Sequence, residues 1–287
     1  MKQLYLFIFI NLVGFSKSNA QQKETSSLLW EISGNALSKP SYLFGTFHLM
    51  CATDFSISKV LSEKLNAAEQ FYGELDMSKP NWQNEMAMSL IMKDQTIEGL
   101  MGKLDFEKAN KKFKEITGMD LTLLNNAKPF MSLSLLTLNS IPCSDKIQPE
   151  TMFINIVNQR KTPVFGLETI TDQMNAIDTQ PLDSQINSLK KMIFNFDSVK
   201  IEMRKMIDVY QLKNVDSLYN YMKQNGADGE FEQELLVKRN QHWIPVITKA
   251  INQKSSFFAV GAGHLGGETG LLNLLKKEGY HIKAINY

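Results

Sequence analysis

Two histidines occur in the same short pattern near opposite ends of the chain. His48 ends the run GTFH and His264 ends the run GAGH, so each lies three residues after a glycine. Acidic residues follow two other short apolar runs, Glu74 after QFYG and Glu168 after PVFGL. Two imidazoles and a carboxylate suit a Zn, Mn, Fe or Co ion that keeps one position open for water. A metal of this kind polarises a carbonyl, and a second carboxylate can move the proton, so the pattern predicts hydrolysis.

Each of these residues also has a purely structural interpretation. A single histidine at a strand end can be a hydrogen-bonded loop residue, and a glutamate there can be a helix N-terminal acid or an ion-pair partner. The shared Gly-x-x-His form favours a functional role for His48 and His264. We assign the other two histidines, His242 and His281, to structure, because one lies in a helical stretch and the other within the last strand.

Glycines surround the second of the two histidine motifs. Four of the seven residues from 261 to 267 are glycine. Because glycine adopts positive φ readily, we expect Gly261 and Gly263 to provide the backbone turn that aims His264 into the site. Gly45 should serve the first motif in the same way.

The elements that must position these residues alternate between strands and helices. Strands are predicted at 41–44, 70–73, 162–167, 256–260 and 280–285, from aromatic and β-branched runs bounded by turn residues. Helical spacing over 56–69, with Ser56 as N-cap, and over 268–278 predicts helices between strands. The regions 82–160 and 169–253 are mostly helical by periodicity, and their methionines fit an adaptable core.

This order predicts an α/β fold. A mostly parallel central sheet would be formed by N- and C-terminal βα units, with a large helical insertion between them. We expect one domain over residues 21–287, with a helical subdomain at about 80–250. Ligands of such sheets bind at the carboxyl ends of the strands, where the histidines and glutamates are predicted to lie.

The first residues predict export. Lys2, an apolar run and the small residues before position 21 are typical of a secretory signal peptide over 1–20. The apolar run is shorter than the roughly 20 residues that span a bilayer, so no stable membrane span is expected after cleavage. Removing 1–20 takes away Lys2 and Lys17 and no acid, so the formal net charge falls by two from +1. This charge gives no case for a nucleic-acid partner, and we expect a periplasmic or extracellular protein.

The chain contains two cysteines, Cys51 and Cys143. In an exported protein they can form a disulfide, although their positions alone do not show that they meet in space. A cysteine metal site is disfavoured because neither lies in a Cys-x-x-Cys spacing. The sequence contains no complete dinucleotide fingerprint or phosphate-binding loop, so we assign no cofactor-binding residues besides the metal ligands.

Several blocks, in order, resemble the TraB/PrgY/GumN family, which is related to the Tiki metalloproteases. They read LW…KPSYLFGTFH, GELD, KTPVFGLETITDQ, RNQHW and VGAGHLGGETGLLNLLKKEGY, and the resemblance runs from about residue 29 to the C-terminus. It implies a TraB/Tiki-like fold and a metal-dependent, hydrolase-like site. His48 and His264 would be the motif histidines, and Glu74 and Glu168 the motif acids.

The resemblance adds two residues that the spacing did not single out. Arg239 and Asn240 match a polar pair expected on a late helix. In the reading that follows, His48, Glu74 and His264 hold a divalent transition metal (Mn, Co or Zn), and Glu168 is the general base. Arg239 or Asn240 would stabilise the oxyanion. Which glutamate binds metal and which moves protons stays open.

Two functions follow from this site. The first is an exported metal-dependent hydrolase, a peptidase acting on a peptide or protein substrate. The alternative is a non-catalytic protein that binds or sequesters a peptide in the same cleft, because some family members are described as inhibitors. The sequence does not assign the oligomeric state.

Overall fold

The computed structural model describes residues 27–225 and 233–287. The proposed signal peptide at 1–20 lies outside these residues. Among the described residues, no helix is both long and apolar enough to cross a bilayer.

The centre of the fold is a six-stranded sheet with strand order β6-β4-β7-β2-β1-β8. The four strands β2, β7, β4 and β6 run parallel to one another, whereas β1 pairs antiparallel with both β2 and β8. The strand bounds are β1 Leu29–Ser33, β2 Ser41–Thr46, β4 Gln70–Gly73, β6 Val164–Gly166, β7 Ser256–Gly261 and β8 His281–Ile285. The predicted α/β class with a mostly parallel sheet is confirmed.

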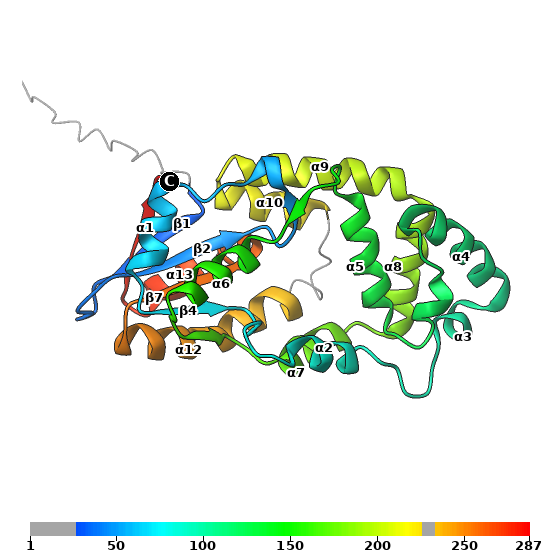
Figure 1. Cartoon of the computed structure of the whole chain (residues 1–287), viewed down its shortest axis with the longest axis horizontal. Helices are drawn as coiled ribbons and strands as arrows, with labels where there is room; N and C mark the ends of the chain where they lie inside the picture. Colours follow the sequence, from blue (N-terminus) through cyan, green and yellow to red (C-terminus); the bar gives the residue numbers. More distant parts are fainter. Residues whose placement is uncertain (1–26, 226–232) are drawn as a thin grey trace, which may run out of the picture.

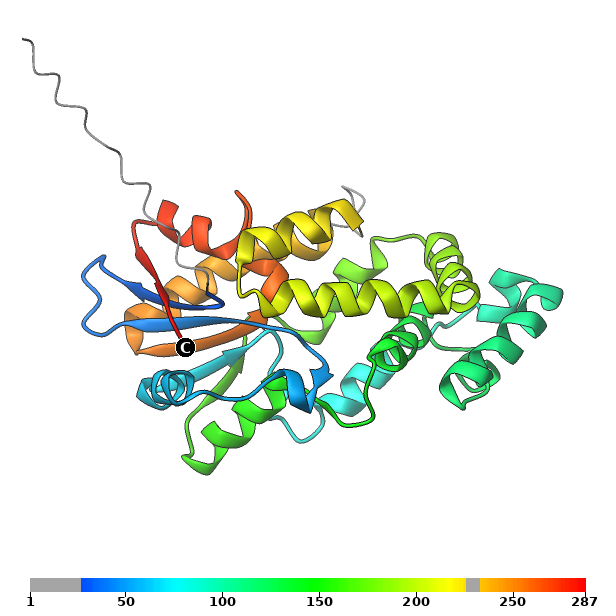
Figure 2. The same ribbon diagram turned by 90° about the horizontal axis from the view of Figure 1, so that it is seen from above.

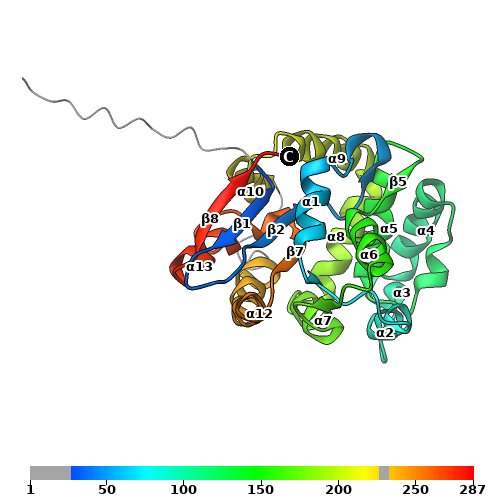
Figure 3. The same cartoon turned by 60° about the vertical axis from the view of Figure 1, so that its left-hand side comes forward.

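Two features of the sheet differ from the prediction. β1 was not predicted as a strand, because its sequence LWEIS has neither clean alternation nor a clear turn at its start. β8 was expected to continue a parallel sheet. It runs antiparallel to β1 and forms the sheet edge (β1 is labelled in Figure 1, and β8 beside it in Figure 3).

Helices cover both faces of the sheet. α1 (Lys59–Ala67) and α6 (Pro149–Gln159) lie on one face, and α12 (Arg239–Gln253) and α13 (Leu271–Lys277) lie on the other (Figures 2 and 3). The N-cap of α1 is Ser58, whose side chain accepts from the Leu61 backbone N–H, and not Ser56 as predicted. Apolar side chains from both helix layers and from the sheet form one core, which includes the buried Trp243, Phe153 and Phe257.

A second group of helices packs around its own core at the other end of the molecule (Figure 1). Phe113 and Leu136 are fully buried in this core. The group comprises α3 (Ile97–Met101), α4 (Lys103–Thr117), α5 (Pro129–Ser140) and α8 (Leu182–Phe194). Other described helices connect this group with the sheet or pack on the core of the sheet: α2 (Trp82–Ser89), α7 (Ile170–Asp178), α9 (Phe196–Gln211) and α10 (Val215–Asn225). The division into one domain with a helical subdomain stays a prediction.

A disulfide joins Cys51 to Cys143. Cys51 ends the short strand β3 (Met50–Cys51), which pairs antiparallel with β5 (Lys146–Ile147). The bridge therefore fastens the segment after His48 to the loop that follows α5.

Candidate active site

The four parallel strands deliver the predicted residues to one edge of the sheet. His48 lies in the loop after β2, Glu74 directly after β4, and Glu168 two residues after β6. His264 ends the 3₁₀ turn that follows β7. All of these strands point the same way, so their carboxyl ends, and the side chains that follow, gather at one place. The structure brings all six predicted site residues together there, because Arg239 and Asn240 begin α12 beside them.

Glu74 is the centre of the cluster. Its Oε1 accepts a hydrogen bond from the backbone N–H of Gly261 at 2.7 Å. The same oxygen lies 3.7 Å from Nε2 of His48 and 3.8 Å from Nε2 of His264. Its Oε2 accepts from Nη2 of Arg239 at 2.7 Å. One oxygen of Glu74 therefore faces both imidazoles, and the other faces a guanidinium.

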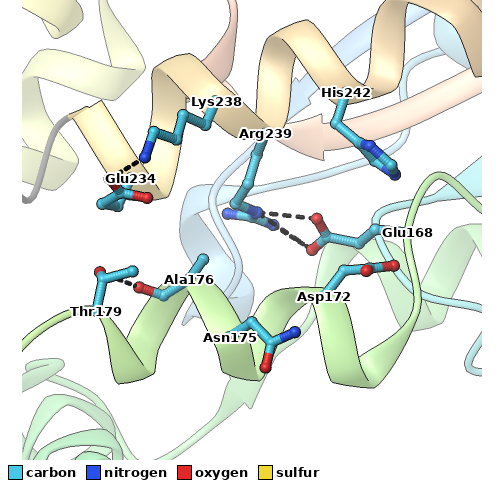
Figure 4. Close-up of a pocket in the computed structure, with 9 residues that line it drawn as sticks. All are labelled: Glu168, Asp172, Asn175, Ala176, Thr179, Glu234, Lys238, Arg239 and His242. Atoms are coloured by element: carbon cyan, nitrogen blue, oxygen red, sulfur yellow. Dashed lines mark hydrogen bonds and ion pairs between the residues drawn. The ribbon is translucent and has the colours of Figure 1, made fainter.

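Arg239 joins Glu74 to the second carboxylate. Its Nε and Nη2 donate to the two oxygens of Glu168 at 3.0 and 2.7 Å, and Figure 4 shows this pair between α12 and α7. Trp243 Nε1 donates to Glu168 at 3.0 Å. The Glu168 side chain is only 1% exposed. Both of its oxygens are thus engaged by donors from α12.

The two carboxylates have opposite pKa shifts. Burial raises the pKa of Glu168, and this effect outweighs the hydrogen bond and charge of Arg239. Burial also acts to raise the pKa of Glu74, but the charges of His48, His264 and Arg239 and the Gly261 N–H lower it well below its usual range. Glu74 is therefore ionised, whereas Glu168 holds a proton more readily than an ordinary glutamate.

His48 is held through its Nδ1 atom. Nδ1 lies 2.6 Å from Oε1 of Glu150, and Thr46 Oγ1 donates to the same oxygen at 2.5 Å. Desolvation opposes a charged ring, but the hydrogen bond to Glu150 and the charges of Glu74 and Glu150 raise the pKa of His48 to about 9. Solvent screens part of this effect, because 64% of the side chain is exposed.

His264 is held in a different environment. Asn240 Nδ2 donates to the carbonyl oxygens of His264 and Thr269, so Asn240 Oδ1 is the atom that faces His264 Nδ1, at 2.7 Å. An amide oxygen only accepts, so Nδ1 carries the ring proton and Nε2 is an acceptor. Arg239 Nη1 lies 3.2 Å from Nε2. Burial lowers the pKa of His264 to about 3, so the ring is neutral.

The glycines of the histidine motifs have separate roles, and the expected positive φ is wrong. Gly261 has a φ of −52°, and Gly263 is not among the positive-φ residues of the described chain. Gly261 instead lets the side chains of His48 and Glu74 lie close to the backbone. A Cβ at this position would lie 2.8 Å from Nε2 of His48 and 3.3 Å from Oε1 of Glu74. A Cβ at Gly263 would meet the end of the Met222 side chain, and one at Gly45 would meet core atoms of Leu265 and Ala262.

The site contains residues that sequence reasoning missed. Glu150 lies in the first turn of α6 and follows no strand, so the strand-end pattern could not identify it. Trp243 was visible only as part of a helical stretch. His242, assigned to structure, is exposed and lines a cavity of about 330 Å³ between α7 and the start of α12 (Figure 4). Asp172 and Asn175 of α7 line the opposite side of this cavity.

The donor set fits a transition metal in its chemistry. Two imidazole Nε2 atoms face one carboxylate oxygen, and both Nδ1 atoms are occupied by side-chain acceptors, which is the usual support for metal-binding histidines. As the side chains stand, however, no group of three or more His, Cys, Asp or Glu residues in the described segments is arranged to hold an ion. The Arg239 guanidinium instead contacts Glu74 and His264.

Comparisons with known proteins identify distant relatives and a family. The chain is 23% identical to the protein named metalloprotease TIKI1 of Xenopus tropicalis, over 93% of the chain and 63% of that protein. It is 20% identical to metalloprotease TIKI1 and to metalloprotease TIKI2 of Danio rerio, with 93% and 91% of the chain covered. It spans 65% and 61% of those two proteins, so it covers less than two thirds of each of these relatives. No solved structure matches. Residues 28–284 match the TraB/PrgY/gumN family, and the chain therefore belongs to that family.

Proposed function

We propose that the protein is an exported, metal-dependent hydrolase that cleaves peptide bonds in a peptide or protein substrate. The observation that carries the proposal is the convergence of His48 Nε2 and His264 Nε2 on Oε1 of Glu74. The distant similarity to metalloproteases supports the same reaction class.

In this proposal His48, Glu74 and His264 hold the metal. The geometry supports Glu74 over Glu168 as the ligand, because Glu74 faces both rings while Glu168 is held by Arg239 and Trp243. A divalent ion such as Mn, Co or Zn would polarise a substrate carbonyl and make water a stronger nucleophile near neutral pH.

Glu168 is the proposed general base. Its raised pKa supports this role, because a base whose pKa lies closer to neutral both takes and returns a proton efficiently. Arg239 and Trp243 donate to its oxygens, so Glu168 accepts a proton only when one of these hydrogen bonds loosens. Arg239 also has Nη1 directed at the cluster, where a cation can stabilise a developing oxyanion. Asn240 has its amide committed to His264 and Thr269, so its part is to hold His264.

Export is part of the proposal. A disulfide between Cys51 and Cys143 suits an oxidising compartment, either the periplasm or the extracellular space.

The test combines metal analysis with peptide-library cleavage. Purified wild type is reconstituted with Mn, Co or Zn, its metal content is measured, and cleavage is followed with and without a chelator. We expect about one metal per chain and cleavage that the chelator abolishes, with both lost in His48→Ala. His281→Ala, at the start of β8 on the sheet edge, is the matched control and should retain both. Absence of stoichiometric metal after reconstitution would contradict the proposal.

One observation favours the alternative of a non-catalytic peptide-binding protein. The Arg239 guanidinium already neutralises Glu74 and contacts His264, so the cluster is complete without a metal. A binding protein of this kind would retain peptide affinity after chelation and in His264→Ala. Loss of peptide binding on chelation would contradict it.

A further inference from the structure

We propose that Glu150 is a positioning residue: when the His48 ring is neutral, Glu150 keeps its single proton on Nδ1 and leaves the Nε2 lone pair directed at Glu74. Its importance for catalysis rests on the proposed function. The state of the ring, however, is a property of this chain alone and can be measured separately.

The position of Glu150 suits this task. Its Oε1 lies 2.6 Å from Nδ1 of His48, just below the roughly 2.7–2.9 Å typical of a charge-assisted N–H···O hydrogen bond. The Thr46 hydroxyl donates to the same oxygen and fixes the carboxylate from the β2 side. Glu150 is only 7% exposed and lies in the first turn of α6, an 11-residue helix whose N-terminus stabilises a negative charge.

Two carboxylates compete for the single proton of a neutral His48 ring. Glu150 is 2.6 Å from Nδ1, whereas Glu74 is 3.7 Å from Nε2. Glu74 also shares its charge with Arg239, which donates to its other oxygen at 2.7 Å. The shorter contact to the less neutralised carboxylate places the proton on Nδ1, so the Nε2 lone pair is free to bind an electrophile.

The second histidine shows that this arrangement is not a simple repeat. His264 is also held through Nδ1, but its acceptor is the neutral amide oxygen of Asn240. A carboxylate behind an imidazole makes the ring more basic than an amide does. The two histidines are therefore unequal: Glu150 makes His48 the more basic of the pair.

Three variants test the proposal by NMR of protein labelled with ¹⁵N-histidine, whose spectrum contains only four rings. Glu150→Leu removes the acceptor, Glu150→Gln keeps an acceptor oxygen without the charge, and Glu63→Gln is a matched change on the exposed surface of α1. Spectra are recorded above the pKa of about 9, where the His48 ring is neutral.

We expect the ring proton on Nδ1 in wild type, Glu63→Gln and Glu150→Gln, and on Nε2 in Glu150→Leu. An Nε2 proton in wild type, or an Nδ1 proton retained in Glu150→Leu, would overturn the proposal. If Glu150→Leu does not fold, a zinc affinity of Glu150→Gln equal to that of wild type would do the same.

Calorimetry with zinc ion alone gives an independent measurement. Glu150→Leu should weaken zinc binding by about 10- to 100-fold, as loss of a carboxylate behind a histidine ligand commonly does. Glu150→Gln should weaken it less, and Glu63→Gln should leave it unchanged. If the wild type binds no zinc, the proposed function fails while the NMR result still decides the role of Glu150. If the wild type binds zinc and Glu150→Leu binds it equally well, the positioning role fails alone.

Discussion

The two histidines of the site differ in what lies behind each ring, and this difference has consequences for stability. The His48 side chain is largely exposed and its Nδ1 contacts a carboxylate, whereas the His264 side chain is buried and its Nδ1 contacts an amide oxygen. Their pKa values move in opposite directions, to about 9 and about 3. Folding therefore favours a charged His48 and a neutral His264.

The His48 shift predicts a loss of stability in mild alkali. Because the folded pKa of about 9 lies above the unfolded value of 6.5, the contribution of His48 is complete below 6.5 and is lost as the pH rises through 9. Urea unfolding at several pH values should show a falling free energy in this interval. The slope should be smaller in His48→Gln, and equal slopes in the two proteins would contradict the assignment. His264 does not contribute here, because its lowered pKa affects stability only as the pH falls from 6.5 through about 3.

A matched pair of glycine substitutions separates the site from the fold. Gly261→Ala places a Cβ 2.8 Å from His48 Nε2, so we expect it to displace the ring and lower metal affinity at least tenfold, because such sites tolerate only about 0.5 Å of error. Gly263→Ala meets only the flexible end of Met222 and should change metal affinity little. Isothermal titration with zinc measures both. Equal losses of zinc affinity in the two variants would contradict the idea that the lack of a Cβ at Gly261 is needed to place His48.

At the scale of the elements, the strands and the residues that follow them could be predicted from the sequence, because strand ends are local signals. Apolar runs such as FFAV followed by glycine identify both an element and its end. Glu150 could not be predicted in this way, because its role depends on where α6 packs relative to β2, which no local pattern encodes. β1 could not be predicted locally either, because its place in the sheet depends on pairing with β2 on one side and β8 on the other.

The disulfide also acts at the scale of the elements, because it joins the end of β3 to the loop after α5. Cys51 and Cys143 are 92 residues apart in sequence, and a closed loop of this length stabilises a fold by about 4.6 kcal/mol in the chain-entropy model. We expect the double variant Cys51→Ser/Cys143→Ser to lose about that much free energy of unfolding in urea. Wild type treated with a reductant is the parallel sample and should lose a similar amount. An unchanged urea midpoint in both would show that the bridge does not constrain the unfolded chain.

At the scale of the whole molecule, the helical group and the sheet have separate hydrophobic cores. We therefore expect that a substitution in the helical core can lower the free energy of unfolding without changing the geometry of the site. Phe113 is fully buried in the core shared by α3, α4, α5 and α8, away from the sheet. Phe113→Ala should lower the free energy of unfolding by about 3–5 kcal/mol, the usual effect of removing a buried ring. The His48 and His264 ring signals should keep their wild-type positions in NMR spectra. Movement of those signals would show that the helical core transmits strain to the site.

The position of β7 in the sheet also determines the order in which parts of the chain can fold during synthesis. β7 lies between β2 and β4, yet it follows both by most of the length of the chain. Until residues 256–261 have been synthesised, the neighbouring edges of β2 and β4 have no partner, and unpaired strand edges invite association with other chains. The helices between residues 97 and 193 pack mainly against one another, so they can form before residues 256–261 are synthesised. A nascent chain therefore carries a folded helical end and an open sheet until its last strands arrive, and the strand that closes the sheet also delivers His264.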